Sequence, residues 1–445
     1  MPQRRLPIWF LCLAAAAPAL AGQSVTLQDA MQRARENARE IAAARARSEA
    51  GRARLESARG YRLPSLRLEE NFIRTDSPAE VFALKLNQER FSFADFMVAD
   101  PNHPSAMNTA ITRLELSLPV YTGGELSARI SQADAAAKAA WDSLEWAGNG
   151  AAFEAAQAYV SLAQAQELAT LLEQSRRTIQ AHVDQARSYA EQGMLVRSEL
   201  LRAEVELARI DDMLQETRGN VRLAAANLAF RLGVDQGTEW ELAALPAPPA
   251  PKEELPAWLA SAVSRSDFTS AQSMLRAGEL EVDVRRAAFL PRVGVVARGD
   301  LVDDRLFGRN GNSTAIMAQA TVNLFAGGSD RAALRAAEWD AKAGREDVAR
   351  FHEGVLLQVR QAWEEAATAR AREKTAAQSV AAAAEAERIV GERFSTGVVK
   401  MLDVLDAATA RREAQTRELV ARASANAALL RLALVAGRAP ESALP

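Results

Sequence analysis

Two spacings of apolar residues alternate along this chain of 445 residues. Residues 124–193 and 328–397 contain no proline, and their apolar residues, many of them alanine, recur every three or four positions. Between Leu126 and Ala147 the intervals are 4, 3, 4, 3, 4 and 3, the heptad pattern of helices that pack lengthwise. We predict long helices at 124–192 and 328–396, each about 100 Å long at about 1.5 Å per residue.

The period changes to two in four segments that precede these helices. One of them alternates three leucines with polar residues, namely Leu114, Leu116 and Leu118 with Arg113, Glu115 and Ser117. We predict strands at about 63–84, 108–121, 291–303 and 313–325. Such alternation is typical of outer-membrane strands, and it also fits a soluble sheet with one solvated face.

Four strands are too few for a closed membrane barrel, so a membrane location requires several chains. An open sheet edge in lipid leaves backbone groups without hydrogen-bond partners. Two chains would supply the roughly eight strands of the smallest membrane barrels, and three would supply about twelve. The pattern alone does not choose between them. Aromatic residues mark the predicted strand ends, as at a membrane interface: Tyr61, Tyr121, Phe289 and Phe325.

The chain contains an internal repeat. "QGMLVRSELLRA" (192–203) aligns with "TGVVKMLDVLDA" (396–407), which puts Gly193 over Gly397, 204 residues apart. Gly123 aligns with Gly327 at the same separation, and Pro64 aligns with Pro291 at 227. Three matches in the same order indicate a tandem duplication. We predict a first repeat at 22–236, a Pro-rich linker at 237–264 and a second repeat at 265–445.

The N-terminus has the features of a secretory signal. Residues 1–21 combine two arginines, an apolar run and an Ala-Leu-Ala end, and the run is too short for a membrane-spanning helix. The only cysteine, Cys12, follows a leucine rather than a small residue, so we expect no lipid anchor. The net charge of −3 argues against nucleic-acid binding.

Asp403 and Asp406 are the most prominent candidates for chemistry, because they lie three residues apart on one helix face. A catalytic carboxylate pair normally spans a cleft, and zinc needs about four ligands. The three histidines, His103, His182 and His352, are scattered, and we expect them at exposed or loop positions. We therefore predict no enzyme activity, no metal site and no cofactor. A simple solvated face remains an alternative for the two aspartates.

The ordered set of motifs resembles the TolC family of outer-membrane efflux channels, over nearly the whole chain after the signal. "VTLQDAMQRARENAREI" (25–41) resembles the family's opening helix, "YRLPSL" and "FLPRV" its strand entries, and "PVYTGG" and "NLFAGG" its strand exits. The most specific stretches are "RFSTGVVKMLDVLDA" (393–407) and its counterpart "EQGMLVRSELLRAEVELA" (191–208).

The resemblance implies a mainly α fold with membrane β structure. Antiparallel coiled-coil helices would form a periplasmic α-barrel, and four strands per chain would join a trimeric, 12-stranded outer-membrane β-barrel. The homotrimer would sit in the outer membrane of a Gram-negative type envelope and meet a periplasmic adaptor and an inner-membrane pump. The junctions between barrel and tunnel would be Pro64, Gly123, Gly124, Pro291, Gly327 and Gly328.

The same resemblance implies that Gly193 and Gly397 are the tips of helical hairpins and that Asp403 and Asp406 line a periplasmic gate. A ring of carboxylates would favour cations. The neighbours of this gate would be Arg197, Ser198, Glu199, Phe394 and Lys400.

One departure from the family concerns how the gate closes. The family has a Tyr and an Arg whose hydrogen bonds help hold the entrance shut, whereas this chain has Phe394 and Val399 there. Lys400 and Arg197 are nearby cations that could substitute for them. The cargo is not readable from the sequence. The competing hypothesis is a periplasmic coiled-coil adaptor or spacer without a channel, which explains the heptads and the signal but leaves the strands unused.

Overall fold

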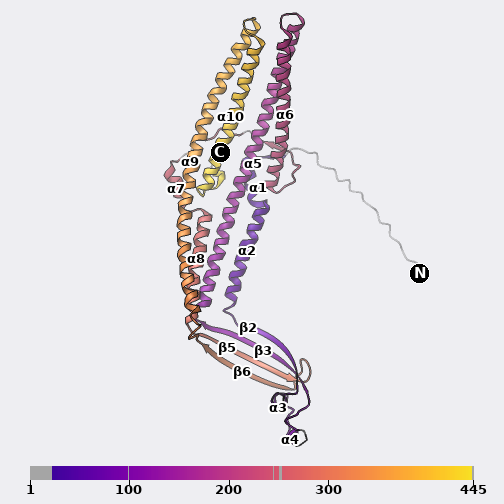
Figure 1. The fold of residues 1–445 in the computed structure, drawn as a ribbon, viewed down its shortest axis with the longest axis vertical. Helices are drawn as coiled ribbons and strands as arrows, with labels where there is room; N and C mark the ends of the chain where they lie inside the picture. The colour runs from indigo at the N-terminus through magenta and orange to yellow at the C-terminus, as the bar shows by residue number, and fades with distance from the viewer. Residues whose placement is uncertain (1–22, 99, 244, 250–252, 443–445) are drawn as a thin grey trace, which may run out of the picture. The chain divides into compact units, whose positions relative to one another are not determined.

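The structure is a computed structural model that describes residues 23–98, 100–243, 245–249 and 253–442 (Figure 1). It contains two compact units. The sheet unit comprises residues 43–146 and 263–355, and the tip unit comprises the described parts of 1–42, 147–262 and 356–445. Neither unit coincides with a sequence repeat, because helices and strands of both repeats pack against one another in each. The predicted signal, 1–21, lies outside the described residues.

The sheet unit contains the four long strands β2 (Ser65–Thr75), β3 (Met107–Thr122), β5 (Arg292–Asp303) and β6 (Gly311–Thr321). They form one antiparallel sheet in the order β2-β3-β5-β6 (Figure 1). The β3–β5 pair joins the two repeats. Its register shifts between Pro119 and Tyr121.

Two strands end earlier than the sequence predicted. The strand predicted at 63–84 ends at Thr75, and helix α3 (Pro78–Asn87) follows it, with a proline in its first turn. Proline starts a helix readily but cannot donate to a sheet ladder. The strand predicted at 313–325 ends at Thr321, opposite Arg292, the first residue of β5. A four-residue helix, α4 (Asp95–Val98), completes the loop before β3.

Helices of the sheet unit pack closely through small residues. The unit contains most of α2 (Arg39–Gly60), α8 (Ser266–Arg286), the short helix η1 (Ala287–Phe289) and the first parts of α5 (Glu125–Glu191) and α9 (Ser329–Ser395). The Oγ of Ser270 on α8 lies 2.9 Å from the carbonyl oxygen of Ala139 and 2.8 Å from the Oγ of Ser143 on α5. Small side chains at this contact let the two helices approach each other closely.

The tip unit contains two helical hairpins. One is formed by the rest of α5 and α6 (Arg197–Leu232), and the other by the rest of α9 and α10 (Met401–Val435) (Figure 1). Helix α1 (Leu27–Asn37) begins at a capping box, in which the Oγ1 of Thr26 accepts from the backbone N–H of Asp29 at 3.1 Å. The helical segment before Pro64 is interrupted at Ala38, whose ψ of 134° is extended. The short helix η2 (Pro440–Ser442) ends the described chain.

The segment 237–264, predicted as a linker, is ordered over its described residues. It contains β4 (Trp240–Leu242), which pairs in parallel with β1 (Gln23–Val25), and helix α7 (Leu255–Ala262). The Tyr159 hydroxyl donates to the carbonyl oxygen of Ala243 at 3.3 Å, and the Asn426 amide donates to that of Pro246 at 3.1 Å. The prolines prevent regular structure in part of the segment, yet side chains of the long helices bind its backbone.

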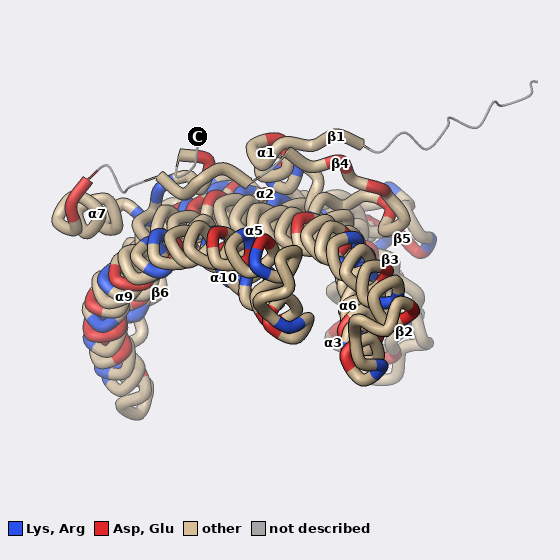
Figure 2. Tube along the Cα trace, turned by 90° about the horizontal axis from the view of Figure 1, so that it is seen from above, with Lys and Arg blue, Asp and Glu red and all other residues tan. Residues whose placement is uncertain are grey.

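Charges of both signs are interspersed along the helices (Figure 2). Several of them form pairs at the surface, which contribute little stability individually. Within the described part of the chain, no helix combines the length and the low charge needed to cross a bilayer.

Candidate functional site

The two hairpin tips have the same backbone geometry. Gly193 lies between α5 and α6 with φ 74°, and Gly397 lies between α9 and α10 with φ 75°. In each tip the residue after the glycine donates its N–H back to the ending helix: Met194 to the Tyr189 carbonyl at 2.9 Å and Val398 to that of Arg393 at 3.0 Å. This is a helix end with a left-handed residue, which glycine adopts without steric cost.

Asp403 and Asp406 both lie exposed in the first turns of α10, just beyond the second tip. The carboxylate of Asp403 accepts a hydrogen bond from the backbone N–H of Lys400 at 2.9 Å, so it closes the start of α10. Asp406 makes no hydrogen bond or ion pair with any residue that the structure describes. The two aspartates therefore differ: one also stabilises its own helix, and the other is available for contacts beyond this chain.

Replacement of Asp403 by alanine should destabilise the first turn of α10 by about 0.5–2 kcal/mol, because the Lys400 N–H loses its acceptor. Asp403→Asn removes the charge but keeps an acceptor, so it should leave this turn nearly unchanged. Amide hydrogen exchange in residues 400–404 measures the difference. Equal protection in the two variants would contradict the capping role.

The tip of the first hairpin carries a different set of charges. Glu199 is half-buried near the start of α6, and Arg197 and Ser198 are exposed. Arg202 occupies the position that corresponds to Asp406 in the repeat. In the described residues, no ion pair joins the Arg197 or Lys400 side chain to either aspartate. Within one described chain, these two cations therefore do not pair with the aspartates.

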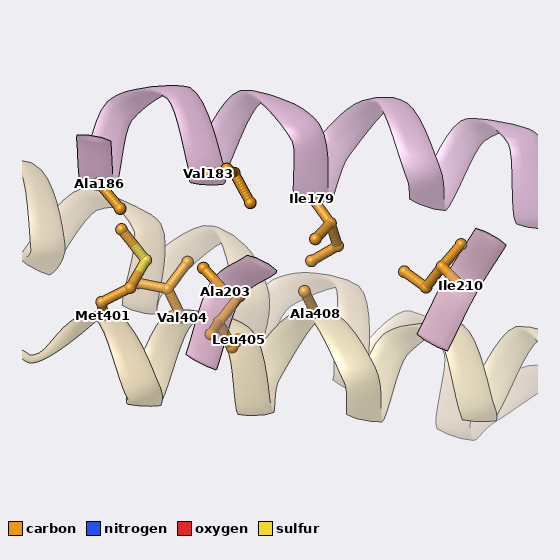
Figure 3. Packing of buried hydrophobic residues seen from close by; sticks show 9 residues of the cluster. All are labelled: Ile179, Val183, Ala186, Ala203, Ile210, Met401, Val404, Leu405 and Ala408. Carbon is orange, nitrogen blue, oxygen red and sulfur yellow. The ribbon is translucent and has the colours of Figure 1, made fainter. Parts of the chain in front are cut away.

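Phe394 and Val399 are both half-buried, and Phe394 contributes apolar contacts instead. The Phe394 ring lies 6.1 Å from the Tyr189 ring, centroid to centroid, so it joins the second hairpin to the first. Phe394 also packs against a buried cluster just behind the tips. Helices α5, α6 and α10 supply this cluster (Figure 3), which consists of Ile179, Val183, Ala186, Ala203, Ile210, Met401, Val404, Leu405 and Ala408.

A buried ion pair continues this contact away from the tips. Arg412 of α10 donates to the carboxylate of Glu206 of α6 at 2.9 Å, and their side chains are only 5% and 14% exposed. Sequence reasoning missed this pair because Arg412 stands among other charged residues. Its position was the available signal: with Met401, Leu405 and Ala408 it continues the apolar stripe of α10, where a charge requires a partner.

The histidines are less exposed than the sequence suggested. His103 is exposed in the loop before β3, but His182 and His352 are half-buried in α5 and α9. Burial lowers the pKa of His182, and the carboxylate of Glu387 opposes this effect. The ring of His352 lies against Phe268 at 5.4 Å. Across the described residues, no three His, Cys, Asp or Glu side chains gather in a group that would hold a metal ion.

The sheet has one apolar and one charged face. Because register and alternation are regular, these side chains share a face: Leu66, Leu68, Leu114, Leu116, Leu118, Val295, Ala297, Ile316 and Ala318. On the opposite face two rows of alternating charge cross the strands: Glu69, Arg113 and Asp300, and Arg67, Glu115 and Arg298. The Arg113 guanidinium binds both oxygens of Asp300, at 2.7 and 3.1 Å. Such a sheet separates lipid from a polar interior.

The predicted junction residues all lie at the same end of the four antiparallel strands. Pro64 and Pro291 directly precede β2 and β5. The glycine pairs that follow β3 and the segment after β6 have left-handed φ values, 66° and 86° for Gly123 and Gly124, and 62° and 84° for Gly327 and Gly328. The four aromatic residues predicted at the strand ends are exposed at this same end of the sheet: Tyr61, Tyr121, Phe289 and Phe325.

Comparisons with known proteins agree with the resemblance that the motifs indicate. The family model for outer membrane efflux proteins matches residues 30–234 and 260–438. The outer membrane efflux protein BepC of Brucella suis biovar 1 is 23% identical over 304 residues, which are 67% of this chain and 66% of BepC.

Solved structures share the fold. The CusC structure superposes with a TM-score of 0.79 at 15% identity, over 93% of this chain and 92% of that chain. VceC, an outer membrane protein of Vibrio cholerae, gives a TM-score of 0.77 at 19% identity, over 93% and 96%. The resemblance inferred from the motifs is confirmed. This chain belongs to the outer membrane efflux protein family: its fold is that of the family's channels, and it resides in the outer membrane with a periplasmic portion.

Proposed function

We propose that three copies of this chain form a passive exit duct of a tripartite efflux or type I secretion system, crossing the outer membrane and the periplasm. The observation that carries this proposal is the sheet with one apolar and one charged face. Among the described residues, its edge strands β2 and β6 have no strand partner on their outer sides. Three such sheets joined edge to edge give about twelve strands, enough for a barrel with an open interior.

The hairpin tips are the proposed periplasmic entrance. Their turns expose apolar side chains, Met194 and Val196 in the first and Val398 in the second, which suits contact with a periplasmic adaptor. Opening would require the two hairpins to separate at the cluster around Met401 and Phe394. Energy would come from the inner-membrane pump, since the family and the fold are those of channels rather than enzymes.

Conductance across a planar lipid bilayer tests this function directly. The purified full-length protein should insert and produce stepwise ionic currents from one side of the membrane. The alternative function, a periplasmic adaptor or spacer without a channel, predicts that the protein adds no conductance. A soluble monomer in the periplasm would likewise contradict the exit duct.

Asp406→Asn should weaken the preference of the channel for cations and its block by multivalent cations. The reason is that Asp406 is exposed and unpaired within the described chain, so three copies would place unneutralised carboxylates at the entrance. Reversal potentials in a salt gradient measure the preference. Glu241→Gln, a charge removal in β4 away from both tips, serves as the matched control. Equal selectivity of the two variants and the wild type would contradict a gate lining by Asp406.

A further inference from the structure

His182 is a titratable side chain at the contact between the two helical hairpins. It lies half-buried on α5, next to Val183, which belongs to the buried cluster behind the tips. Helices α5 and α9 both run toward the tips, where the rings of Tyr189 and Phe394 lie 6.1 Å apart. His182 and Glu387 each precede these rings by seven residues, about two helical turns, so they face each other across the same α5–α9 contact.

The carboxylate that faces His182 is already bound to a cation. Glu387 is only 16% exposed, and it accepts a hydrogen bond from the guanidinium of Arg411 on α10. A protonated His182 would have to share this carboxylate with Arg411, so two positive charges would meet one negative charge in a half-buried contact. Charges in such surroundings are costly unless each has its own partner.

The neighbouring charges are paired as well. A polar cavity of about 160 Å³ begins one turn from His182, between α5, α9 and α10. Glu387, Arg411 and Arg412 line it, and Arg412 is bound in turn to Glu206 of α6. Both carboxylates of this region therefore already have a cation. The residues one turn along α5 from His182 are uncharged: Thr178, Ile179, Gln185 and Ala186.

We propose that this contact is acid-sensitive: when His182 gains a proton, the contact of α5 with α9 and α10 weakens and the tips open more readily. The inference rests on the proposed channel and adds a regulation of its entrance. Burial lowers the pKa of His182, and the attraction of Glu387 opposes this effect only in part. Once the hairpins separate, the ring becomes exposed and its pKa returns toward the usual value of about 6.5.

Acid favours the separated hairpins because of this difference in pKa. Well above pH 6.5, roughly the usual pKa, the ring is neutral in both states and the contact has its full stability. As the pH falls toward the lowered pKa of the closed state, the separated hairpins take up the proton first, so their population rises. A difference of one bound proton changes the ratio of the two states by at most about tenfold per pH unit.

Chemical labelling of a buried cysteine measures the separation without requiring conduction. Val404→Cys places a thiol in the cluster, where the valine is 2% exposed, and Leu223→Cys places a reference thiol where the leucine is 71% exposed. The only native cysteine, Cys12, lies in the predicted signal. The ratio of the two labelling rates with a maleimide removes the effect of pH on thiol reactivity. We expect this ratio to rise about 3–10-fold between about pH 7.5 and pH 5.5.

Substitution of the histidine identifies the group that titrates. His182→Gln is neutral at every pH, so its labelling ratio should stay constant over this range. His182→Lys introduces a cation, so its ratio should be high already at about pH 7.5. Helical circular dichroism at about pH 8 shows whether the glutamine variant is folded, and His182→Asn takes its place if it is not.

His352→Gln is the matched control. It replaces another half-buried histidine, which lies in the sheet unit with its ring against Phe268. The acid response of the labelling ratio should persist in this variant.

Three results would contradict the proposal. Equal acid responses in the wild type and in His182→Gln would assign the titration to other groups. A labelling ratio that stays constant in the wild type, or that falls on acidification, would overturn the acid-sensitive contact directly.

Bilayer recordings separate the acid-sensitive contact from the proposed function. Conduction without a labelling response would leave the exit duct standing and overturn the contact alone. A labelling response in a protein that never conducts would support the contact and contradict the exit duct.

Discussion

Glu206→Ala should lower the free energy of unfolding by about 3–5 kcal/mol, because it leaves the guanidinium of Arg412 buried without its carboxylate. The pair joins α6 to α10, so its loss should loosen the contact between the two hairpins. Chemical denaturation followed by helical circular dichroism measures the change. A shift of under about 1 kcal/mol would show that water or another acceptor replaces Glu206.

Two further variants identify the cause. Glu173→Ala breaks a pair of similar length, 2.9 Å to Arg218, whose side chains are 41% and 47% exposed, and it should cost no more than about 1 kcal/mol. Glu206→Leu combined with Arg412→Leu removes both buried charges. This double variant should recover most of the lost stability, since apolar residues often replace a buried pair without cost.

Met401→Ala should cost about 2–5 kcal/mol, because the Met401 side chain is fully buried at the point where the second tip meets α5 and α6. The cavity would lie directly behind the tips. We therefore expect a second effect, a larger fraction of time in the conducting state in bilayer recordings.

Leu223→Ala is the control for this substitution. Leu223 lies on α6 and is 71% exposed, so its truncation should change the free energy of unfolding by about 0.5 kcal/mol or less. A Met401→Ala variant that loses stability without any change in channel opening would separate the cluster from the gate.

Much of the fold could be predicted from local patterns. Absence of proline and a heptad spacing locate α5 and α9 within about one residue, and alternation locates β3 and β5. These elements are long and strongly periodic, so each position supports the others.

Features set by distant contacts were missed. The interruption at Ala38 is one, since Arg39 and its neighbours are ordinary helix formers. There the backbone of Gly233, with φ 70°, approaches Asn37 so closely that a Cβ would lie 2.8 Å from the Asn37 carbonyl oxygen. The end of β6 at Thr321 is another, because it depends on where its partner strand stops rather than on its own sequence.

The candidate site likewise combines features that local sequence predicts with features that depend on contacts in the fold. Sequence and repeat placed the glycines and aspartates of the tips, but whether a carboxylate caps its helix depends on a distance that no motif reveals. Asp403 and Asp406 look equivalent in "MLDVLDA", and only Asp403 reaches the Lys400 N–H. The Glu206–Arg412 pair joins residues 206 positions apart, and only the buried stripe of α10 hinted at it.

Some of the first described residues of the chain find their partners late during synthesis. Strand β1 pairs with β4 more than two hundred residues downstream, and the Arg35 guanidinium binds Glu441 at 2.7 Å. A nascent chain therefore carries Arg35 of α1 without its partner Glu441 until almost the last residue has been added. Such contacts between distant residues slow folding and prolong the exposure of apolar surface. Premature termination before α10 should consequently yield an aggregation-prone product rather than a shorter folded unit.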